Sequence, residues 1–296
     1  MKRRNLLFYS FLFLVGCTAG NSNKNKPFSQ SVTTKPEKLR VSITEVKGID
    51  ELERDYGALR SSLGEILEQK IEFFPVQNYL AAVVALQSNQ VDLVLTGPSE
   101  YVVIRSRTNA TPVIGISRPN YYSLMCVRAD SNIKSVGELK GKKIAMWDVG
   151  STSGHLSPIK FLIEAGLDPK SDVKVEMMRS KGLSALNKGE IDAWGGSAVK
   201  YEKFIKENNL TEKDLPVLIK GPDLPNDLFV AGSQLNLEFV EELRQRLLNN
   251  QTKLIDSLSA VEEGKFIGSK LEPAQDSDYD MIREVYKAIG QGDFID

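Results

Sequence analysis

Short apolar runs alternate with helix-spaced apolar residues through the first third of the chain, and this alternation constrains the fold more than any other feature of the sequence. In chain order these strand-like and helix-like segments span residues 39–44, 50–69, 71–75, 79–88, 91–95 and 99–107. Strands that alternate with helices in this way form parallel sheets whose faces the helices cover. The sequence therefore predicts an α/β fold.

The same rhythm returns in a second series of segments. Strand-like runs fall at 122–128, 143–146, 173–177, 191–193 and 217–219, with helical segments at 135–139, 153–165, 183–188 and 198–207. After an apolar run at 227–231 the pattern is helical to the C-terminus, and no internal repeat is evident. Two such series predict two α/β lobes.

We expect the chain to cross twice between these lobes. Lobe 1 would comprise residues 39–125 together with 228–296, and lobe 2 would comprise residues 126–227. The crossing segments, near 123–128 and 226–232, would form a two-segment hinge. In open α/β sheets a ligand binds beyond the carboxyl ends of the parallel strands, so these ends are where we look for a site.

The composition excludes several classes of function. The 296 residues include 38 lysines and arginines against 39 aspartates and glutamates, and a net charge of −1 argues against a nucleic-acid partner. One histidine and two cysteines cannot supply the four ligands of a structural zinc site. We expect neither a metal nor a cofactor.

The N-terminus has the pattern of an export signal. Lys2, Arg3 and Arg4 precede an apolar run at 6–16, which as a helix would rise about 16 Å, too little for a bilayer core of about 30 Å. A short apolar run after positive charges is typical of a signal peptide, here residues 1–16, rather than of a membrane span.

The signal segment ends in Leu14-Val15-Gly16-Cys17, which resembles a bacterial lipobox. The resemblance implies cleavage before Cys17 and lipidation of its thiol. The alternative is an ordinary secretory signal followed by an unrelated cysteine. Residues 17–38 are polar and predict a lipidated flexible tether. We therefore expect a protein of the cell envelope, held at the membrane by lipid alone on the periplasmic or extracytoplasmic face.

A run of three hydroxyl residues is the most informative motif in the chain. Ser151, Thr152 and Ser153 lie between two glycines, where the strand at 143–146 leads into a helix. The first amide N–H groups of a helix lack partners and carry a partial positive charge, so hydroxyls beside them form a donor pocket for a tetrahedral oxyanion. The alternative is ordinary N-capping, for which one hydroxyl is enough.

Three further residues are candidates for the same pocket. Tyr79 and Tyr101 lie near helix starts that follow predicted strands, and their phenolic O–H groups can donate to an anion. Asp192 ends the strand-like Gly189-Glu-Ile-Asp stretch, where a carboxylate would accept a ligand proton or pair with a ligand amine. The alternatives are core packing for the tyrosines and a surface turn for Asp192.

His155, the only histidine, directly follows the hydroxyl turn. It would donate to the ligand, or it would be a buried ring with its hydrogen bonds satisfied within the first helical turn. Trp147 and Trp194 would line the cleft or pack in the core.

At these positions the chain resembles the periplasmic binding proteins of phosphate, phosphite and phosphonate ABC transporters, the PhnD-like group. The resemblance runs from about Arg40 to the C-terminus. Its landmarks are Asn78-Tyr79, Asp92, Gly97-Pro98-Ser99-Glu100-Tyr101, Leu139-Lys-Gly-Lys-Lys-Ile-Ala, Gly150-Ser-Thr-Ser-Gly-His, Gly189-Glu-Ile-Asp192 and Leu224-Pro-Asn-Asp227.

The resemblance implies a type II periplasmic-binding-protein fold that closes on its ligand. It implies an ABC permease and ATPase as partners, and we expect a monomer. It also implies a set of oxyanion contacts, with Asp192 opposite them: Tyr79, Tyr101, Ser151, Thr152, Ser153 and His155.

One stretch departs from the family pattern. Where members often carry a histidine or an acidic residue before the helix that precedes the Gly189 stretch, this chain has Arg179 and Lys181. The ammonium of an aminoalkyl phosphonate would lack a carboxylate partner there. The departure therefore favours phosphite or phosphate over 2-aminoethylphosphonate.

The function we expect is capture of a phosphorus oxyanion and its delivery to a permease. If Asp192 accepts a P–OH proton, sulfate should bind poorly. A sensory ectodomain for the same anions is the alternative. A hydrolase is disfavoured for two reasons. In a Gly-x-Ser-x-Gly elbow a glycine lies two residues before the nucleophilic serine, whereas Ser151 lies two residues before Ser153, and the chain has no second histidine. We therefore expect that the protein is not an enzyme.

Overall fold

The computed structural model describes residues 35–46, 48–259 and 261–295. The predicted signal peptide, Cys17 and most of the predicted tether lie outside the described residues. Among the helices that are described, none is both long enough and apolar enough to cross a membrane.

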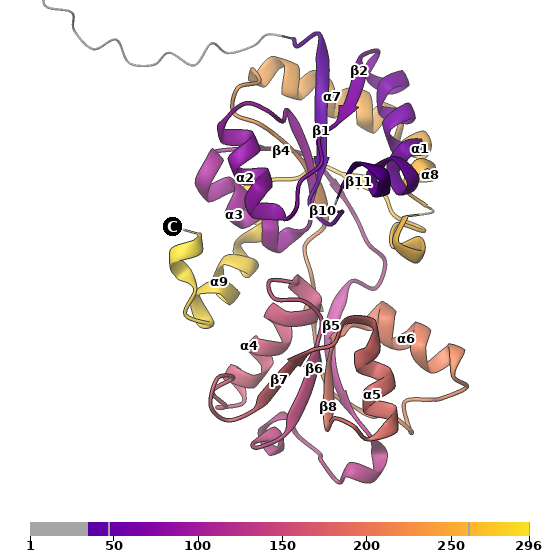
Figure 1. The fold of residues 1–296 in the computed structure, drawn as a ribbon, viewed down its shortest axis with the longest axis vertical. Coiled ribbons are helices and arrows are strands. Elements are labelled where there is room, and N and C mark those ends of the chain that lie inside the picture. The colour runs from indigo at the N-terminus through magenta and orange to yellow at the C-terminus, as the bar shows by residue number, and fades with distance from the viewer. Residues whose placement is uncertain (1–34, 47, 260, 296) are drawn as a thin grey trace, which may run out of the picture. The chain divides into compact units, whose positions relative to one another are not determined.

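A six-stranded sheet organises the first lobe (Figure 1). Its strands are, in spatial order, β11 (Leu271–Glu272), β4 (Thr111–Ile116), β10 (Asp227–Ala231), β3 (Leu93–Thr96), β1 (Lys38–Ile43) and β2 (Lys70–Phe73). Strand β1 runs parallel to β2 and β3, whereas β10 is antiparallel to β3 and β4. The carboxyl ends of β1, β2 and β3 and the amino end of β10 therefore share one edge of this sheet.

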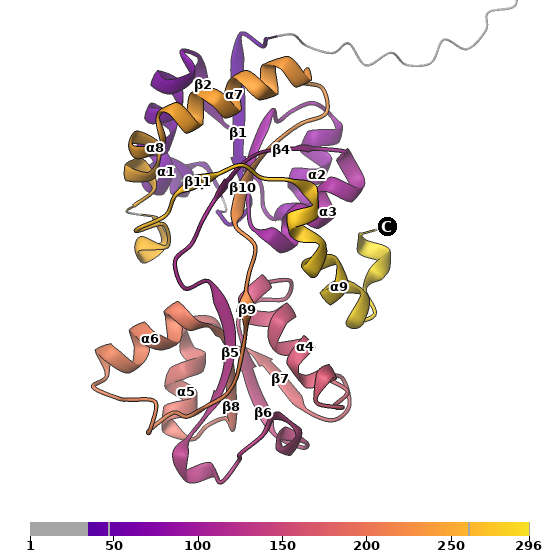
Figure 2. The same cartoon turned by 180° about the vertical axis from the view of Figure 1, so that it is seen from behind.

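Helices cover both faces of the first sheet. One face carries α1 (Ile49–Leu67), α7 (Leu237–Asn249) and α8 (Gln251–Leu258), and the other carries α2 (Tyr79–Gln87) and α3 (Pro98–Thr108) (Figure 2). In β3, Leu93 and Leu95 pack with the first group of helices and Val94 packs with the second. Because both faces are buried, the strand is continuously apolar rather than alternating.

A five-stranded sheet organises the second lobe. Its strands are, in spatial order, β7 (Lys174–Met177), β6 (Lys143–Met146), β8 (Ala193–Ser197), β5 (Tyr122–Val127) and β9 (Val217–Asp223). Strand β6 is parallel to β7 and β8, and β5 is antiparallel to β8 and β9. Helix α4 (Ser157–Glu164) packs on one face, and α5 (Gly182–Lys188) and α6 (Ala198–Glu207) pack on the other.

The C-terminal helix α9 (Asp280–Ala288) contacts elements of both lobes. Its buried Val285 and Tyr286 share an apolar cluster with Val102 and Val103 of α3 and with Leu156, which follows the hydroxyl turn. This helix therefore joins α3 to the segment that carries the hydroxyl turn.

Sheet membership places the crossing segments at different residues from those we expected. All of β5, from Tyr122, pairs within the second sheet, and β10 pairs within the first sheet from Asp227 onward. The crossings are therefore 117–121 and 224–226, between the ends of the flanking strands. Strands β4 and β11 were not predicted.

The two lobes contain a structural repeat that the sequence did not reveal. In the first lobe the N–H of Arg40 donates to Asp92 Oδ2 at 2.9 Å, and Asp92 N donates to Arg40 O at 2.9 Å. In the second lobe the N–H of Lys143 donates to Asp192 Oδ2 at 2.8 Å, and Asp192 N donates to Lys143 O at 3.0 Å. Each aspartate joins the start of one parallel strand to the start of its neighbour.

Candidate functional site

The hydroxyl run forms a wide turn between β6 and α4. Residues Thr152–Leu156 make one turn of π-helix, in which Leu156 N donates to Ser151 O at 2.9 Å. The N–H of Ser157 donates to Thr152 O and begins α4. A single π-turn at a helix start is uncommon and is frequently found at functional sites.

Only one of the three hydroxyls caps the turn. Ser151 Oγ accepts from Gly154 N at 3.3 Å, which is the N-capping role. Thr152 Oγ1 instead accepts from the N–H of Ser99, in the first turn of α3, at 3.2 Å. Ser123 Oγ, in β5, donates to Ser153 O at 2.8 Å and fixes the backbone of the turn to the second sheet. Simple capping therefore explains Ser151 but not the other two hydroxyls.

Two backbone N–H groups of the turn have no hydrogen-bond acceptor among the described residues. Thr152 and Ser153 are 4% and 8% exposed, and within the described residues no acceptor meets either of their N–H groups. Buried N–H groups are almost always paired, because an unmade hydrogen bond costs about 1–3 kcal/mol. Two such groups at a helix start form a site for an oxyanion.

The backbone of this turn requires glycine. A Cβ on Gly154 would lie 2.3 Å from the Cβ of Trp147, whose own N–H donates to Gly154 O at 2.8 Å. Gly150 has a φ of +88°, in the left-handed region that other residues rarely adopt. The path of the backbone through this turn therefore depends on both glycines.

The imidazole of His155, which follows the hydroxyl turn, is neutral. Its Nδ1 accepts from Gly150 N at 3.2 Å, so in the neutral ring the proton is on Nε2. Burial lowers the pKa of His155, which keeps the ring uncharged at neutral pH. An anion near the turn would therefore receive a hydrogen bond from Nε2–H but no positive charge.

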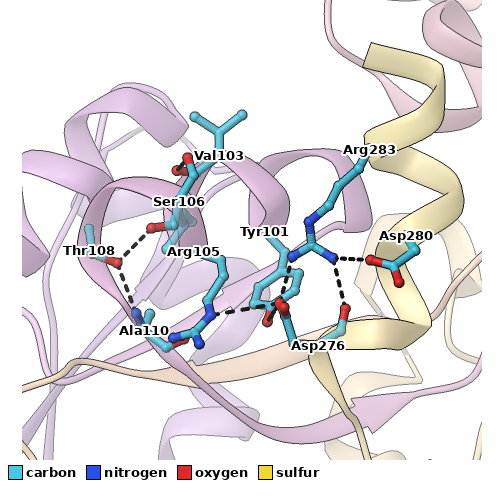
Figure 3. A network of polar contacts seen from close by, with 10 residues as sticks. Tyr101, Val103, Arg105, Ser106, Thr108, Ala110, Asp276, Asp280 and Arg283 are labelled. Carbon is cyan, nitrogen blue, oxygen red and sulfur yellow. Dashed lines mark hydrogen bonds and ion pairs between the residues drawn. The ribbon is translucent and has the colours of Figure 1, made fainter. Parts of the chain in front are cut away.

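Tyr101 is not directed at the turn. Its ring is fully buried, and its hydroxyl donates to Asp276 Oδ1 at 2.6 Å (Figure 3). Arg283 and Arg105 reach the same carboxylate from two sides, so the phenol is part of a network with the C-terminal segment. The expected contact between Tyr101 O–H and an anion is replaced by this internal hydrogen bond.

The other predicted tyrosine lies at the start of α2. Asn78 Oδ1 accepts from Ala81 N at 3.0 Å, so Asn78 is the N-cap of this helix. Tyr79 is the first residue of α2, and its side chain is not described by the structure. Its contact with a ligand stays a prediction.

The expected position of Asp192 is wrong. It lies immediately before β8, at the amino end of the strand, whereas the hydroxyl turn follows the carboxyl end of the parallel β6. Its carboxylate joins β8 to Lys143 of β6, as Asp92 joins β3 to β1. Asp192 therefore lies at the opposite edge of the sheet from the hydroxyl turn, where its carboxylate joins two strands.

Arg179, where the chain departs from the family pattern, forms an ion pair with Asp148. Arg179 Nε donates to Asp148 Oδ1, and Nη2 contacts Oδ2, each at 2.8 Å. Arg179 has a φ of +47°, an uncommon conformation for this residue. Its charge is therefore balanced by Asp148, and it does not add a free cation beside the hydroxyl turn.

The two tryptophans differ in their surroundings. Trp194 is buried in the core beneath α5 and α6. Trp147 begins the segment between β6 and the hydroxyl turn, and the ammonium of Lys200 lies 4.0 Å from the centre of its ring.

A cluster of charged residues at the edge of the first sheet was missed by the sequence analysis. Asp227, 2% exposed, begins β10, and Lys265 Nζ lies 2.8 Å from its Oδ2 and 2.6 Å from Glu45 Oε2. Arg118 Nη1 is 3.5 Å from Asp227 Oδ1, and its guanidinium stacks on the ring of Tyr121 at 3.6 Å. The Leu224-Pro-Asn-Asp227 landmark was the one signal in the sequence that could have identified this carboxylate.

Glu100 completes the cluster from the first turn of α3. Ser99 Oγ donates to Glu100 Oε2 at 2.9 Å, and a Cβ placed on Gly97 would lie 2.7 Å from the same oxygen. The carboxyl group therefore lies against the amino end of its own helix. Burial, and then the nearby Glu45 carboxylate, raise the pKa of Glu100 to about 7.

Two helix starts, one from each lobe, thus meet at the hydrogen bond between Ser99 N and Thr152 Oγ1. The amides of Thr152 and Ser153 and the neutral imidazole belong to the segment that precedes α4, and the carboxyl groups of Glu45, Glu100 and Asp227 with two cations belong to the edge of the first sheet. Within the described residues, no group of three or more histidine, cysteine, aspartate or glutamate side chains is arranged to hold a metal ion. The arrangement suits a small oxyanion that both accepts and donates hydrogen bonds.

Comparisons with known proteins match most of the chain to one family. A family model described as the periplasmic substrate-binding protein of phosphonate ABC transporters matches residues 42–279. The phosphate-import protein PhnD of Mycolicibacterium smegmatis is 26% identical over 91% of each chain. The probable ABC transporter phosphite binding protein PhnD1 of Prochlorococcus marinus is 25% identical over 89% of this chain and 94% of its own length.

A solved structure supports the same fold. PhnD1 from Prochlorococcus marinus in complex with methylphosphonate has a TM-score of 0.66 to this chain at 22% identity, and the match covers 87% of this chain and 100% of that one. This likeness confirms the type II periplasmic-binding-protein fold that the sequence predicted.

Proposed function

This chain belongs to the family of periplasmic substrate-binding proteins of phosphonate ABC transporters, and on that basis we propose that it captures a phosphorus oxyanion and delivers it to an ABC permease and ATPase. The ligand would be phosphite, phosphate or a small phosphonate, the anions named for the relatives that it resembles.

The unpaired amides of the hydroxyl turn are the observation that carries this proposal. The N–H groups of Thr152 and Ser153, which no acceptor among the described residues meets, would act as a donor set together with the Ser153 hydroxyl and His155 Nε2–H. A tetrahedral oxyanion accepts several hydrogen bonds from such a set, and each bond to a charged oxygen is stronger than one to a neutral acceptor.

Capture would couple the ligand to both lobes. The donor set follows β6 of the second sheet, and Thr152 already contacts the first turn of α3 from the first sheet. A ligand held between these elements binds the closed arrangement better than the open one, and its affinity shifts the population toward the closed state.

The choice among anions would depend on protons. Because Asp192 lies at the opposite edge of its sheet from the hydroxyl turn, the carboxylate that would accept a proton from the ligand is Asp227. Sulfate at neutral pH has no proton to donate, and it would meet this carboxylate without compensation.

Binding without catalysis is the activity that the site supports. His155 is the only histidine, and its Nδ1 is occupied by Gly150 N, so no second group orients it as a base toward a serine. We propose that the protein acts as a monomer, anchored at the extracytoplasmic face of the membrane through Cys17.

Isothermal titration calorimetry with phosphite, phosphate, methylphosphonate and sulfate tests this function. We expect saturable binding of at least one of the three phosphorus anions and much weaker binding of sulfate. Sulfate binding as tight as that of every phosphorus anion, or binding of none of the four, would refute the proposal.

A further inference from the structure

Helix α3 begins with a carboxyl group folded over its own amino end. Glu100 is the third residue of the helix, and its Oε2 accepts from Ser99 Oγ at 2.9 Å. The same oxygen occupies the space that a side chain on Gly97, the N-cap, would fill. An internal carboxyl group therefore lies where the first amides of a helix would otherwise attract an anion.

Like charges face this carboxyl group from two other elements. Glu45, which follows β1, and Asp227, which begins β10, both act on Glu100 electrostatically. The cations of the cluster are already shared: Lys265 Nζ lies between Glu45 and Asp227, and Arg118 lies beside Asp227 and over Tyr121. Among the described residues, this cluster therefore contains three carboxyl groups and two cations.

The carboxyl group is also next to the proposed ligand site. The N–H of Ser99, the residue before Glu100, donates to Thr152 Oγ1 in the hydroxyl turn. A doubly charged anion at the amides of Thr152 and Ser153 would therefore stand close to an ionised Glu100. Two negative groups so placed in a partly buried site repel each other strongly.

We propose that Glu100 takes up a proton when a doubly charged oxyanion binds at the hydroxyl turn, so that ligand capture is coupled to proton uptake by this residue. This inference rests on the proposed function. It adds that the protein binds the anion together with one proton, which Glu100 holds. In its protonated form, Glu100 presents a hydrogen-bond donor instead of a negative charge.

The pKa of Glu100 places this change at a useful pH. At about 7, the carboxyl group is about half protonated at neutral pH before any ligand arrives. A nearby dianion raises the pKa further, because it disfavours the ionised form. Binding should therefore weaken as the pH rises above 7, even for a ligand whose own charge no longer changes.

An acidic residue near the start of a helix can also have an ordinary structural role, which predicts a lowered rather than a raised pKa. A glutamate that only stabilises the helix dipole is ionised, and its pKa falls. Its replacement by glutamine would then weaken the helix and leave proton uptake unchanged. The two roles can be separated with one substitution.

Calorimetry of phosphite binding in two buffers of different ionisation enthalpy measures the proton uptake directly. The comparison uses the purified protein, the variant Glu100→Gln, and the control Glu238→Gln, which makes the same change at an exposed position in the first turn of α7. Phosphite contributes the same uptake to all three proteins, so the difference between wild type and Glu100→Gln belongs to Glu100.

We expect Glu100→Gln to take up less of a proton per phosphite at pH 7.5 than the wild type and Glu238→Gln. Between pH 6.5 and 8.5, wild-type affinity should fall on the order of tenfold further than that of Glu100→Gln. Equal proton uptake in the wild type and Glu100→Gln, with phosphite bound by both, would refute the proposed role of Glu100. It would leave the proposed function standing. Absence of phosphorus-anion binding in all three proteins would instead refute the proposed function, and this inference with it.

A measurement on the wild type keeps the inference testable if Glu100→Gln does not fold. In an infrared difference spectrum at pH 7.5, added phosphite should increase the absorption of a protonated carboxyl group. A spectrum with no such increase would contradict the inference.

Discussion

The backbone N–H of Ser99 donates to Thr152 Oγ1 over 3.2 Å, and this hydrogen bond joins the first turn of α3 to the hydroxyl turn that precedes α4. Ser99 belongs to the lobe of the six-stranded sheet and Thr152 to the lobe of the five-stranded sheet. A ligand at the amides beside Thr152 therefore lies where the two lobes already meet. Under the proposed function, an anion at this position would favour closure.

Removal of a hydroxyl from the turn should weaken anion binding. Ser151→Ala loses the cap on Gly154 N, and Thr152→Ala loses the acceptor for Ser99 N, so each variant loosens the donor set. We expect each change to reduce the binding free energy for phosphite by about 1–3 kcal/mol, as measured by calorimetry. Ser61→Ala, on the exposed face of α1, is the matched control. Unchanged affinity in both turn variants would remove the turn from the site.

Gly154→Ala should disable the turn more completely than either hydroxyl variant. The new methyl group would lie 2.3 Å from the Cβ of Trp147, so the turn must change its path. We expect a loss of phosphite affinity of at least tenfold and destabilisation of about 1–3 kcal/mol in chemical denaturation. Gly57→Ala, within α1 and with no atom within 4 Å of the added group, should instead stabilise by up to about 1 kcal/mol. Normal phosphite affinity in Gly154→Ala would contradict this account of the turn.

Asp192→Asn should affect stability and leave the ligand affinity unchanged. The carboxylate accepts from Lys143 N at the start of β6, and a weaker acceptor there costs about 1 kcal/mol of unfolding free energy. Asp92→Asn should cost more, about 3 kcal/mol, because Asp92 is buried and also pairs with the guanidinium of Arg40. A tenfold loss of phosphite affinity in Asp192→Asn would restore Asp192 to the site.

Glu100→Gln should stabilise the protein at high pH. The pKa of Glu100 is raised from 4.5 to about 7 in the folded state, so the folded protein holds a proton that the unfolded chain releases. Glu100 therefore costs wild-type stability as the pH rises from about 4.5 through about 7, and the variant avoids this loss. Between pH 5 and pH 8, the melting temperature of the variant should rise relative to that of the wild type, on the order of a few degrees. A stability difference that does not grow as the pH rises would show that folding does not raise the pKa of Glu100.

Cys17→Ala tests the anchor, which lies outside the described residues. If the Leu14-Val15-Gly16-Cys17 motif directs lipidation, the variant should move from the membrane fraction to the soluble fraction of the cell envelope. A Ser31→Ala variant, which leaves the motif intact, should remain in the membrane fraction. Continued anchoring of Cys17→Ala would favour an ordinary secretory signal.

The class of fold could be predicted because buried parallel strands leave a strong local signal. Leu93, Val94 and Leu95 are apolar in succession because each face of β3 contacts helices, and residues 228–231 of β10 show the same pattern. The edge strand β11 is two residues long and leaves no periodic pattern to read.

The site could be predicted only in part, because a sequence motif identifies a turn but not its partners. The run Ser151–Ser153 was visible as a helix start, whereas the contact of Tyr101 with Asp276 joins residues 175 positions apart. The buried pair of Asp227 and Lys265 likewise forms only in the folded chain. Asp192 was misplaced because β8 begins one residue after it, and that boundary decides which edge of the sheet it occupies.

A crystal structure of the protein with bound methylphosphonate tests the central claim most directly. We predict that phosphonate oxygens lie within hydrogen-bonding distance of the N–H groups of Thr152 and Ser153, the Ser153 hydroxyl and His155 Nε2. Phosphonate density elsewhere in the protein, with those amides facing only solvent or protein, would contradict it.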